Sequence, residues 1–206
     1  IAGSIRADSG RVRFANADIT GLPPHQLFRL GLLRTFQVPQ MFARMTVREN
    51  LMVVPALQSG ENLLVAWLAW RKVRREDRAV ADKADGALNF LNLAHVADEL
   101  AGTLSGGQKK LLELGRTMMV DAKTVLLDEP GAGVNRTLLA DLTAAIQRLN
   151  QDHGYTFCII EHDMDLVAEL CEPVIVMSQG RILAQGSMAE VRSNRQVLEA
   201  YFGGAA

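Results

Sequence analysis

The chain has 206 residues, of which 49% are apolar, so it can bury a sizeable core and does not have the composition of a disordered protein. Its net charge of −1 at pH 7 gives no reason to expect nucleic-acid binding, which normally shows as a strongly basic face. Two cysteines cannot form a disulfide framework, and no segment reaches the ~18–20 apolar residues that a membrane-spanning helix needs.

The N-terminal segment is predicted to combine short strands with one short helix. Arg11 to Phe14 alternates as a strand does. Pro23-Pro24 opens a helix that continues through Leu30, and Gly31 follows its end, in keeping with the preference for proline at the start and glycine after the end. Leu33 to Gln37 predicts a further strand.

The middle of the chain is predicted to be mostly helical. Thr46 and Glu49 have the spacing of a capping box, in which the two side chains cap one helix start. From Glu61 to about Leu100 the pattern is helical and charged. Because the composition changes between about Thr46 and Asp121, we expect a helical lobe inserted in an α/β core.

Within this lobe, an apolar run from Leu63 to Trp70 is followed at once by the basic run Arg71 to Arg75. The apolar run is too short to span a bilayer, so we expect a buried or partner-facing helix. The basic residues from Arg71 to Arg78 leave two interpretations open, a solvated helix face or a contact with lipid headgroups.

The C-terminal part alternates strands with helices. Thr124 to Leu127 is a continuous apolar run, typical of a strand covered on both faces. Phe157 to Ile160 is predicted as a second buried strand, in which Cys158 is a reduced, buried thiol. The other predictions are helices over 136–149, 163–170 and 187–202, a strand over 174–177, and a hairpin from there into 181–184. Strands separated by helices predict an α/β fold with a mostly parallel sheet.

The string Leu104 to Gln108 predicts a phosphate-binding helix start. Ser105 is a good N-cap, and apolar residues repeat at helical spacing directly after Gly106 and Gly107. A helix start exposes unpaired N–H groups, and glycines let an anion approach them. The alternative is an ordinary loop before an ordinary helix.

Asp128 and Glu129 follow the apolar strand, where carboxylates need a cation or hydrogen-bond donors. Magnesium held through water by Asp128 would meet that need, and Glu129 could orient or deprotonate a water aimed at a phosphate. The alternative is that both residues cap the next helix. His162 follows another strand and is expected at the same sheet edge, where it could sense a phosphate.

Three motifs follow one another in the chain: Leu104 to Gln108, the strand that ends in Asp128-Glu129-Pro130, and Ile160 to Asp163. Their order and spacing resemble the ATP-binding subunit of ABC transporters, and the resemblance covers essentially the whole chain. The resemblance implies a P-loop NTPase (RecA-like) core. Within it, Gln37 looks like the Q-loop glutamine, which contacts the metal and faces the membrane subunit. Residues 131–135 look like the D-loop, with Asn135 where many members have aspartate.

Longer strings narrow the resemblance to one branch. Arg34 to Gln37, Met45 to Leu51, Ala132 to Asn135 and Glu161 to Val167 look like the LivG-type ATPases. These serve importers of branched-chain amino acids and related amide or urea systems. A peripheral location on the cytoplasmic face of the cell membrane is therefore expected.

The resemblance also implies a mechanism that uses ATP and Mg²⁺. Two ATPase subunits, identical or different, would meet head to tail, and Ser105, Gly106 and Gly107, with Gln108 and Asn135, would contact the nucleotide held by the partner. Glu129 would be the general base, and His162 would hold the γ-phosphate. Asp128 and Gln37 would serve the metal. Closure of the pair would drive membrane permease subunits, which a periplasmic or extracellular substrate-binding protein supplies.

Four segments are expected. They are an incomplete N-terminal part of the ATPase core with the Q-loop (1–45), a helical lobe with the string Leu104 to Gln108, here called the signature (46–122), the C-terminal part of the core (123–186) and a helical tail (187–206).

No Gly-Lys pair occurs in the chain, so the usual phosphate-cradling loop is missing. Losing three or four charged hydrogen bonds forfeits about 5–10 kcal/mol, whereas micromolar binding amounts to about 8 kcal/mol. The polypeptide as given is therefore expected to be a fragment that does not hydrolyse ATP. The alternatives are a non-catalytic subunit that supplies only the signature half of a composite site, and a soluble ABC ATPase outside transport.

Overall fold

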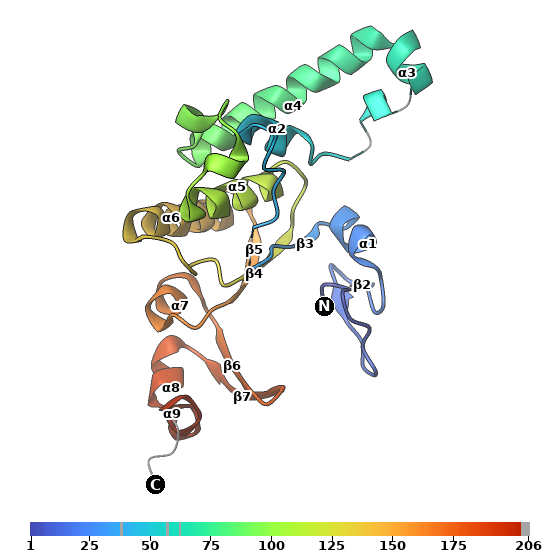
Figure 1. Cartoon of the computed structure of the whole chain (residues 1–206). Coiled ribbons are helices and arrows are strands. Elements are labelled where there is room, and N and C mark those ends of the chain that lie inside the picture. The colour runs from blue at the N-terminus through green and yellow to red at the C-terminus, as the bar shows by residue number, and fades with distance from the viewer. Residues whose placement is uncertain (38, 57, 62, 203–206) are drawn as a thin grey trace. The chain divides into compact units, whose positions relative to one another are not determined.

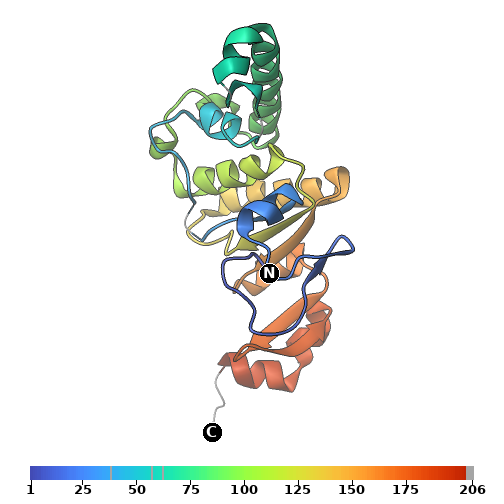
Figure 2. The ribbon, with the colours of Figure 1, turned by 90° about the vertical axis from the view of Figure 1, so that its right-hand side faces the viewer.

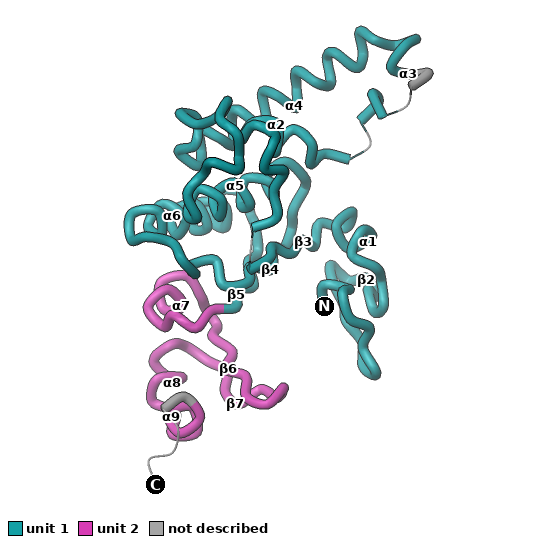
Figure 3. The backbone as a smooth tube through the Cα atoms, in the orientation of Figure 1, with its two compact units in different colours: residues 1–160 teal, residues 161–206 magenta. Residues whose placement is uncertain are grey.

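The computed structural model describes residues 1–37, 39–56, 58–61 and 63–202. The chain divides into two compact units, Ile1–Ile160 and Glu161–Ala206, and Figure 3 colours them separately. This boundary follows the last strand of the parallel sheet. The four segments expected from the sequence stay predictions.

A three-stranded parallel sheet forms the centre of the first unit, in the order β3 (Leu32–Arg34), β4 (Thr124–Asp128) and β5 (Thr156–Ile160). Leu126 pairs with Arg34 on one side and with Cys158 on the other. The helical lobe occupies the long connection between β3 and β4, and α6 (Arg136–His153) connects β4 to β5 (Figure 1). The predicted α/β fold with a parallel sheet is confirmed.

Helices cover one face of this sheet. Val125 and Leu127 of β4 are buried on that face, and the buried side of α6 includes Leu142 and Ile146. The helix α5 (Gly106–Met118) contacts α6, and both lie along the same side of the strands in Figure 2. The buried leucines of α5 therefore join the core that positions the carboxyl end of β4.

The opposite face is covered unevenly, which corrects two predictions. Leu32 packs there with Ile19 and Leu27, but Cys158 is exposed and Ile160 is 58% exposed. The strand β5 lies at the end of the described sheet and alternates between exposed and partly buried residues, so it is not a doubly covered strand. The predicted buried thiol was therefore wrong.

The N-terminal segment forms a small cluster beside β3. The two-residue strands β1 (Arg13–Phe14) and β2 (Ala17–Asp18) pair antiparallel. The helix α1 (Pro24–Arg29) begins as predicted and ends one residue earlier, with Leu30 as its C-cap, and Gly31 follows with φ +88°.

The helical lobe contains α2 (Val47–Met52), α3 (Leu63–Leu68), α4 (Trp70–Phe90) and three 3₁₀ turns, η1 (Ser59–Glu61), η2 (Ala94–Val96) and η3 (Ala101–Thr103). The predicted capping box at Thr46 and Glu49 is present. Asn50 is completely buried, and its amide donates to the carbonyl oxygens of Phe42 and Thr46. It thereby fixes the chain that leads from the Q-loop segment into the lobe.

The second unit contains α7 (Met164–Leu170), the antiparallel pair β6 (Val174–Ser178) and β7 (Arg181–Gly186), α8 (Met188–Ser193) and α9 (Arg195–Phe202). Gln179 and Gly180 both have positive φ, as a tight hairpin turn requires. β6 pairs antiparallel with β7, so the predicted hairpin is confirmed.

No helix in the described part of the chain is long and apolar enough to cross a membrane.

Candidate functional site

The signature string forms the start of α5. Ser105 Oγ accepts from the Gln108 backbone N–H at 3.4 Å, and Gln108 Oε1 accepts from the Ser105 N–H at 3.0 Å. Gln108 therefore has a structural role as the second half of a capping box. The amides of Gly106 and Gly107 lie in the first turn, where they have no partner within the helix.

The two glycines differ in what surrounds them. A Cβ on Gly107 would lie 2.6 Å from Leu138 Cδ1, so this glycine allows α5 and α6 to approach closely. A Cβ on Gly106 would meet nothing closer than the Gly133 carbonyl oxygen at 3.6 Å. Gly106 is exposed and Gly107 is buried, so Gly106 presents the open approach for an anion.

Glu129 and Gln37 come together at the end of β4, although 92 positions separate them in the chain. Gln37 Nε2 donates to Glu129 Oε2 at 2.7 Å. Glu129 has φ +47°, in the left-handed region that non-glycine residues rarely adopt. Its N–H donates to the Ile160 carbonyl at 2.9 Å, which anchors this strained turn to β5.

Asp128 is directed to a different partner. Its Oδ2 lies 3.1 Å from Arg34 Nη2, on the neighbouring strand β3. The Asp128 carboxylate is therefore partly neutralised by a side chain that the sequence analysis did not single out.

Lys110 connects the signature helix to both site residues. Its Nζ donates to the Gln37 carbonyl at 2.8 Å and to the Glu129 carbonyl at 3.2 Å. The residue is only 7% exposed, so these main-chain oxygens replace the water that the ammonium group loses.

Two further residues on the same face of α5 hold the chain around Gln37. Glu113 Oε1 accepts from the Phe36 N–H at 2.9 Å, and Arg116 donates to the Gln40 carbonyl. Burial raises the pKa of Glu113 above its usual value, and the bond from Phe36 opposes that rise. With Lys110, these side chains make a three-residue clamp (Lys110, Glu113 and Arg116) on the Q-loop segment.

The two residues predicted to hold the metal contact different side chains, Asp128 that of Arg34 and Gln37 that of Glu129. Among the residues that the structure describes, no group of three or more His, Cys, Asp or Glu side chains could hold a metal ion. A carboxylate and an amide carry oxygen donors of the kind that binds Mg²⁺, which usually takes one or two protein ligands together with phosphate oxygens and water, so the metal roles of Asp128 and Gln37 stay predictions.

The other two predicted site residues are found at helix starts or in the second unit. Asn135 caps α6, and its Oδ1 accepts from the Leu138 N–H at 3.0 Å. His162 belongs to the second unit, where its side chain is 71% exposed and its Nδ1 lies 3.8 Å from Glu161 Oε2. The position of His162 relative to Glu129 stays a prediction.

Comparisons with known proteins identify the family of the chain. The ABC transporter family matches residues 1–132, and the branched-chain amino acid ATP-binding cassette transporter family matches residues 181–206. A LivG protein of Archaeoglobus fulgidus, described as a probable branched-chain amino acid transport ATP-binding protein, is 41% identical over 98% of this chain and 77% of its own length. The chain belongs to the ABC transporter family of ATP-binding proteins.

Further relatives place the chain in the branched-chain amino acid branch of this family. The BraF protein of Pseudomonas aeruginosa is 37% identical, and the LivG protein of Escherichia coli K12 is 34% identical, each over 98% of this chain and 80% of its own length. A solved nucleotide-free ATP-binding cassette of an ABC transporter superposes with a TM-score of 0.81 at 40% identity, over 98% of this chain and 81% of the other. A cassette solved in its ADP conformation gives 0.79 at 40% identity, over 98% and 80%.

Neither the clamp on α5 nor the Arg34–Asp128 pair was predicted from the sequence. One signal was present, because Lys110, Glu113 and Arg116 are polar residues spaced three apart in an otherwise leucine-rich helix. That spacing places them near one another on the helix surface. It does not say which segment they contact.

Proposed function

We propose that this chain is part of an ATP-hydrolysing subunit that powers an importer of branched-chain amino acids or related amides. The observation that carries the proposal is the meeting of Gln37, Glu129 and Lys110. It connects a helix that starts with the signature to the carboxylate proposed as general base.

In this function, the signature binds a nucleotide held by a second ATP-binding subunit. The first-turn amides of α5 present positive charge, and Gly106 leaves them accessible to the γ-phosphate. Ser105 and Gln108 fix the helix start in that position. Asn135, as the cap of α6, fixes the neighbouring loop that would face the partner.

Hydrolysis is assigned to Glu129 as the general base. The bond from Gln37 orients its carboxylate, and the left-handed turn directs it away from the regular strand. Bound Mg²⁺ would supply charge stabilisation at the phosphates, held by Asp128 and Gln37. His162 is proposed to hold the γ-phosphate and to orient the attacking water.

A groove beside the Q-loop supports a contact with membrane permease subunits. Its lining includes Phe28, Phe36 and Val54, together with the clamp residues Glu113 and Arg116. Phe36 is 50% exposed, so the groove presents apolar surface directly next to Gln37. A permease segment in this groove would move the Q-loop, and the subunit would lie on the cytoplasmic face of the membrane.

The experiment compares wild type with Glu129→Gln in the whole gene product, including any residues that precede Ile1 in its reading frame. Loss of a general base costs ~10²–10⁴-fold in turnover. We expect phosphate release to fall by that factor while nucleotide binding persists, and leucine uptake with the permease subunits to stop. Unchanged phosphate release by the variant would remove Glu129 from its role.

A further inference from the structure

The outer end of the helical lobe carries features that the proposed ATPase function does not use. Both tryptophans of the chain, Trp67 and Trp70, are found there, on α3 and at the start of α4 (Figure 1). Trp67 is 78% exposed, Leu68 is 73% exposed and Trp70 is 49% exposed. Exposed aromatic and aliphatic side chains gathered at one place mark an interaction site.

A stripe of arginines continues from these residues along α4. Arg71, Arg74, Arg75 and Arg78 are all exposed, and helical geometry places them within a sector of about 100°. This sector lies opposite the side of α4 that buries Ala84 and Ala87. Over the described residues, none of the four guanidinium groups forms an ion pair.

The arginines are also positioned beside the aromatic surface. The guanidinium carbons of Arg71 and Arg74 lie 5.4 Å and 5.1 Å from the centre of the Trp70 ring. This cation–π arrangement keeps charge and aromatic surface together at the lobe end.

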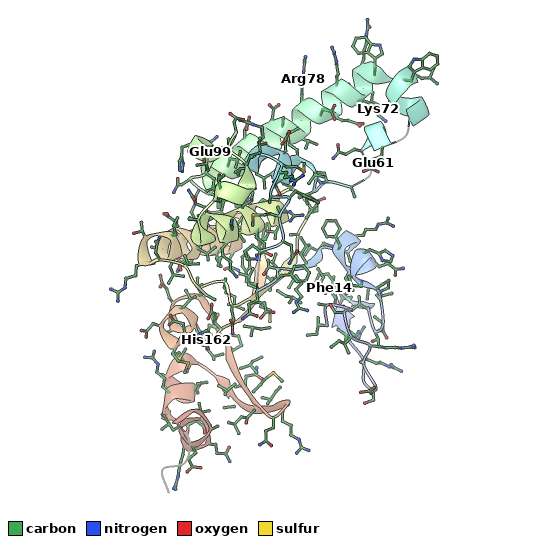
Figure 4. All side chains as sticks on the ribbon, in the orientation of Figure 1. Phe14, Glu61, Lys72, Arg78, Glu99 and His162 are labelled. Carbon is green, nitrogen blue, oxygen red and sulfur yellow. The ribbon has the colours of Figure 1, made fainter. Side chains whose placement is uncertain are left out.

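The remaining basic residue of the run lies on another side of α4 and is already paired. Lys72 Nζ lies 3.7 Å from Glu76, and Glu76 accepts from both the backbone and the hydroxyl of Ser59 in η1. Figure 4 shows Lys72 on the side of α4 toward η1, with Arg78 on the outer side. Glu76 is thus used to attach η1, and Asp77, the other carboxylate within the run, lies outside the sector of the stripe by helical geometry.

We propose that Trp67, Leu68, Trp70 and the stripe of Arg71, Arg74, Arg75 and Arg78 form a surface that binds a bilayer of anionic phospholipids. Four guanidinium groups that form no ion pair within the described part of the chain attract anionic headgroups, and tryptophan rings prefer the interface between headgroups and acyl chains. The chain as a whole has a net charge of −1, so this attraction is local and not a property of the overall charge. The surface does not depend on bound nucleotide.

The test measures tryptophan fluorescence and co-sedimentation with vesicles. Because both tryptophans lie in the surface, any blue shift reports on it directly. We expect a blue shift and sedimentation with vesicles of phosphatidylcholine and phosphatidylglycerol in equal parts, and neither with phosphatidylcholine alone. High salt should reverse the binding, because the attraction is screened.

Paired variants separate the stripe from general charge. Arg75→Gln with Arg78→Gln should weaken binding by at least about tenfold, since each cation near an anionic surface contributes about fivefold. Lys72→Gln with Lys83→Gln removes the same charge from other sides of α4 and should leave binding unchanged. Equal weakening by both pairs would overturn the proposal. The absence of a blue shift on anionic vesicles would also overturn the proposal. That outcome includes a surface that binds purified permease subunits in detergent and does not bind vesicles.

Discussion

Lys110 is a buried cation that donates hydrogen bonds to two main-chain carbonyl oxygens, one from Gln37 and one from Glu129. Burying an ammonium group is costly unless its hydrogen bonds are replaced. Both acceptors belong to segments that carry proposed catalytic side chains. The lysine therefore holds the Q-loop and the turn after β4 at a fixed distance, and it helps to offset the strain of the Glu129 backbone.

Replacing Lys110 by methionine should therefore destabilise the protein more than an ordinary surface change. Hydrogen bonds to a charged group are worth about 1.5–3 kcal/mol, and we expect a loss of free energy of unfolding in that range, measured by urea denaturation. Lys109→Met, one position away on the same helix, should change stability by less than about 0.5 kcal/mol. Equal losses in the two variants would contradict the proposed role of Lys110.

At the scale of elements, α5 makes contacts through two of its sides. One side approaches α6 at Gly107, and the other grips the Q-loop segment through the three-residue clamp. A movement of α5 would therefore be transmitted to Gln37 and, through Lys110, to Glu129.

The approach to α6 can be tested at Gly107. Alanine there places a methyl group 2.6 Å from Leu138 Cδ1, which is closer than such atoms normally come. Overpacking of this kind costs typically 1–3 kcal/mol, so Gly107→Ala should lower the thermal unfolding midpoint. Gly106→Ala, where a Cβ has space, is the control. An equal drop in the midpoint of Gly106→Ala would contradict close packing at Gly107.

The clamp can be tested through Glu113 and pH. Because burial raises its pKa, the folded state binds a proton more tightly than the unfolded state does. This contribution to stability is complete below the unfolded-state pKa and is lost as pH rises through the higher folded-state pKa. Glu113→Gln should flatten the loss of stability with rising pH over that window, in denaturation curves measured at several pH values. An unchanged pH profile would show that Glu113 is not buried as described.

At the scale of the whole molecule, the sequence predicted best what is decided locally. The capping box at Thr46 and the N-cap at Ser105 depend on residues within one helical turn, and both were predicted and are present. The β6–β7 hairpin has a local turn at Gln179 and Gly180, and it too was predicted and is present. The covering of a strand depends on distant segments, so the exposure of Cys158 could not be predicted from an apolar run. The Gln37–Glu129 contact has the same origin, because β3 and β4 are neighbours only after folding.

The central claim is that the amides of Ser105 to Gly107 bind the terminal phosphate of a nucleotide held by a neighbouring subunit. Gly106→Asp tests it, because the side chain has space within this chain and a carboxylate is well tolerated at a helix start. The added negative charge would occupy the place proposed for the phosphate. Gly86→Asp, also without close neighbours, adds the same charge elsewhere in the helical lobe.

The measurement is ATP-dependent self-association of the whole gene product, monitored by sedimentation. All proteins carry Glu129→Gln, so that bound ATP is retained. We predict that ATP causes the Gly86→Asp protein to dimerise, as it does the protein with Glu129→Gln alone, whereas the Gly106→Asp protein remains monomeric. Pairing of the Gly106→Asp protein at the same ATP concentration would contradict the account.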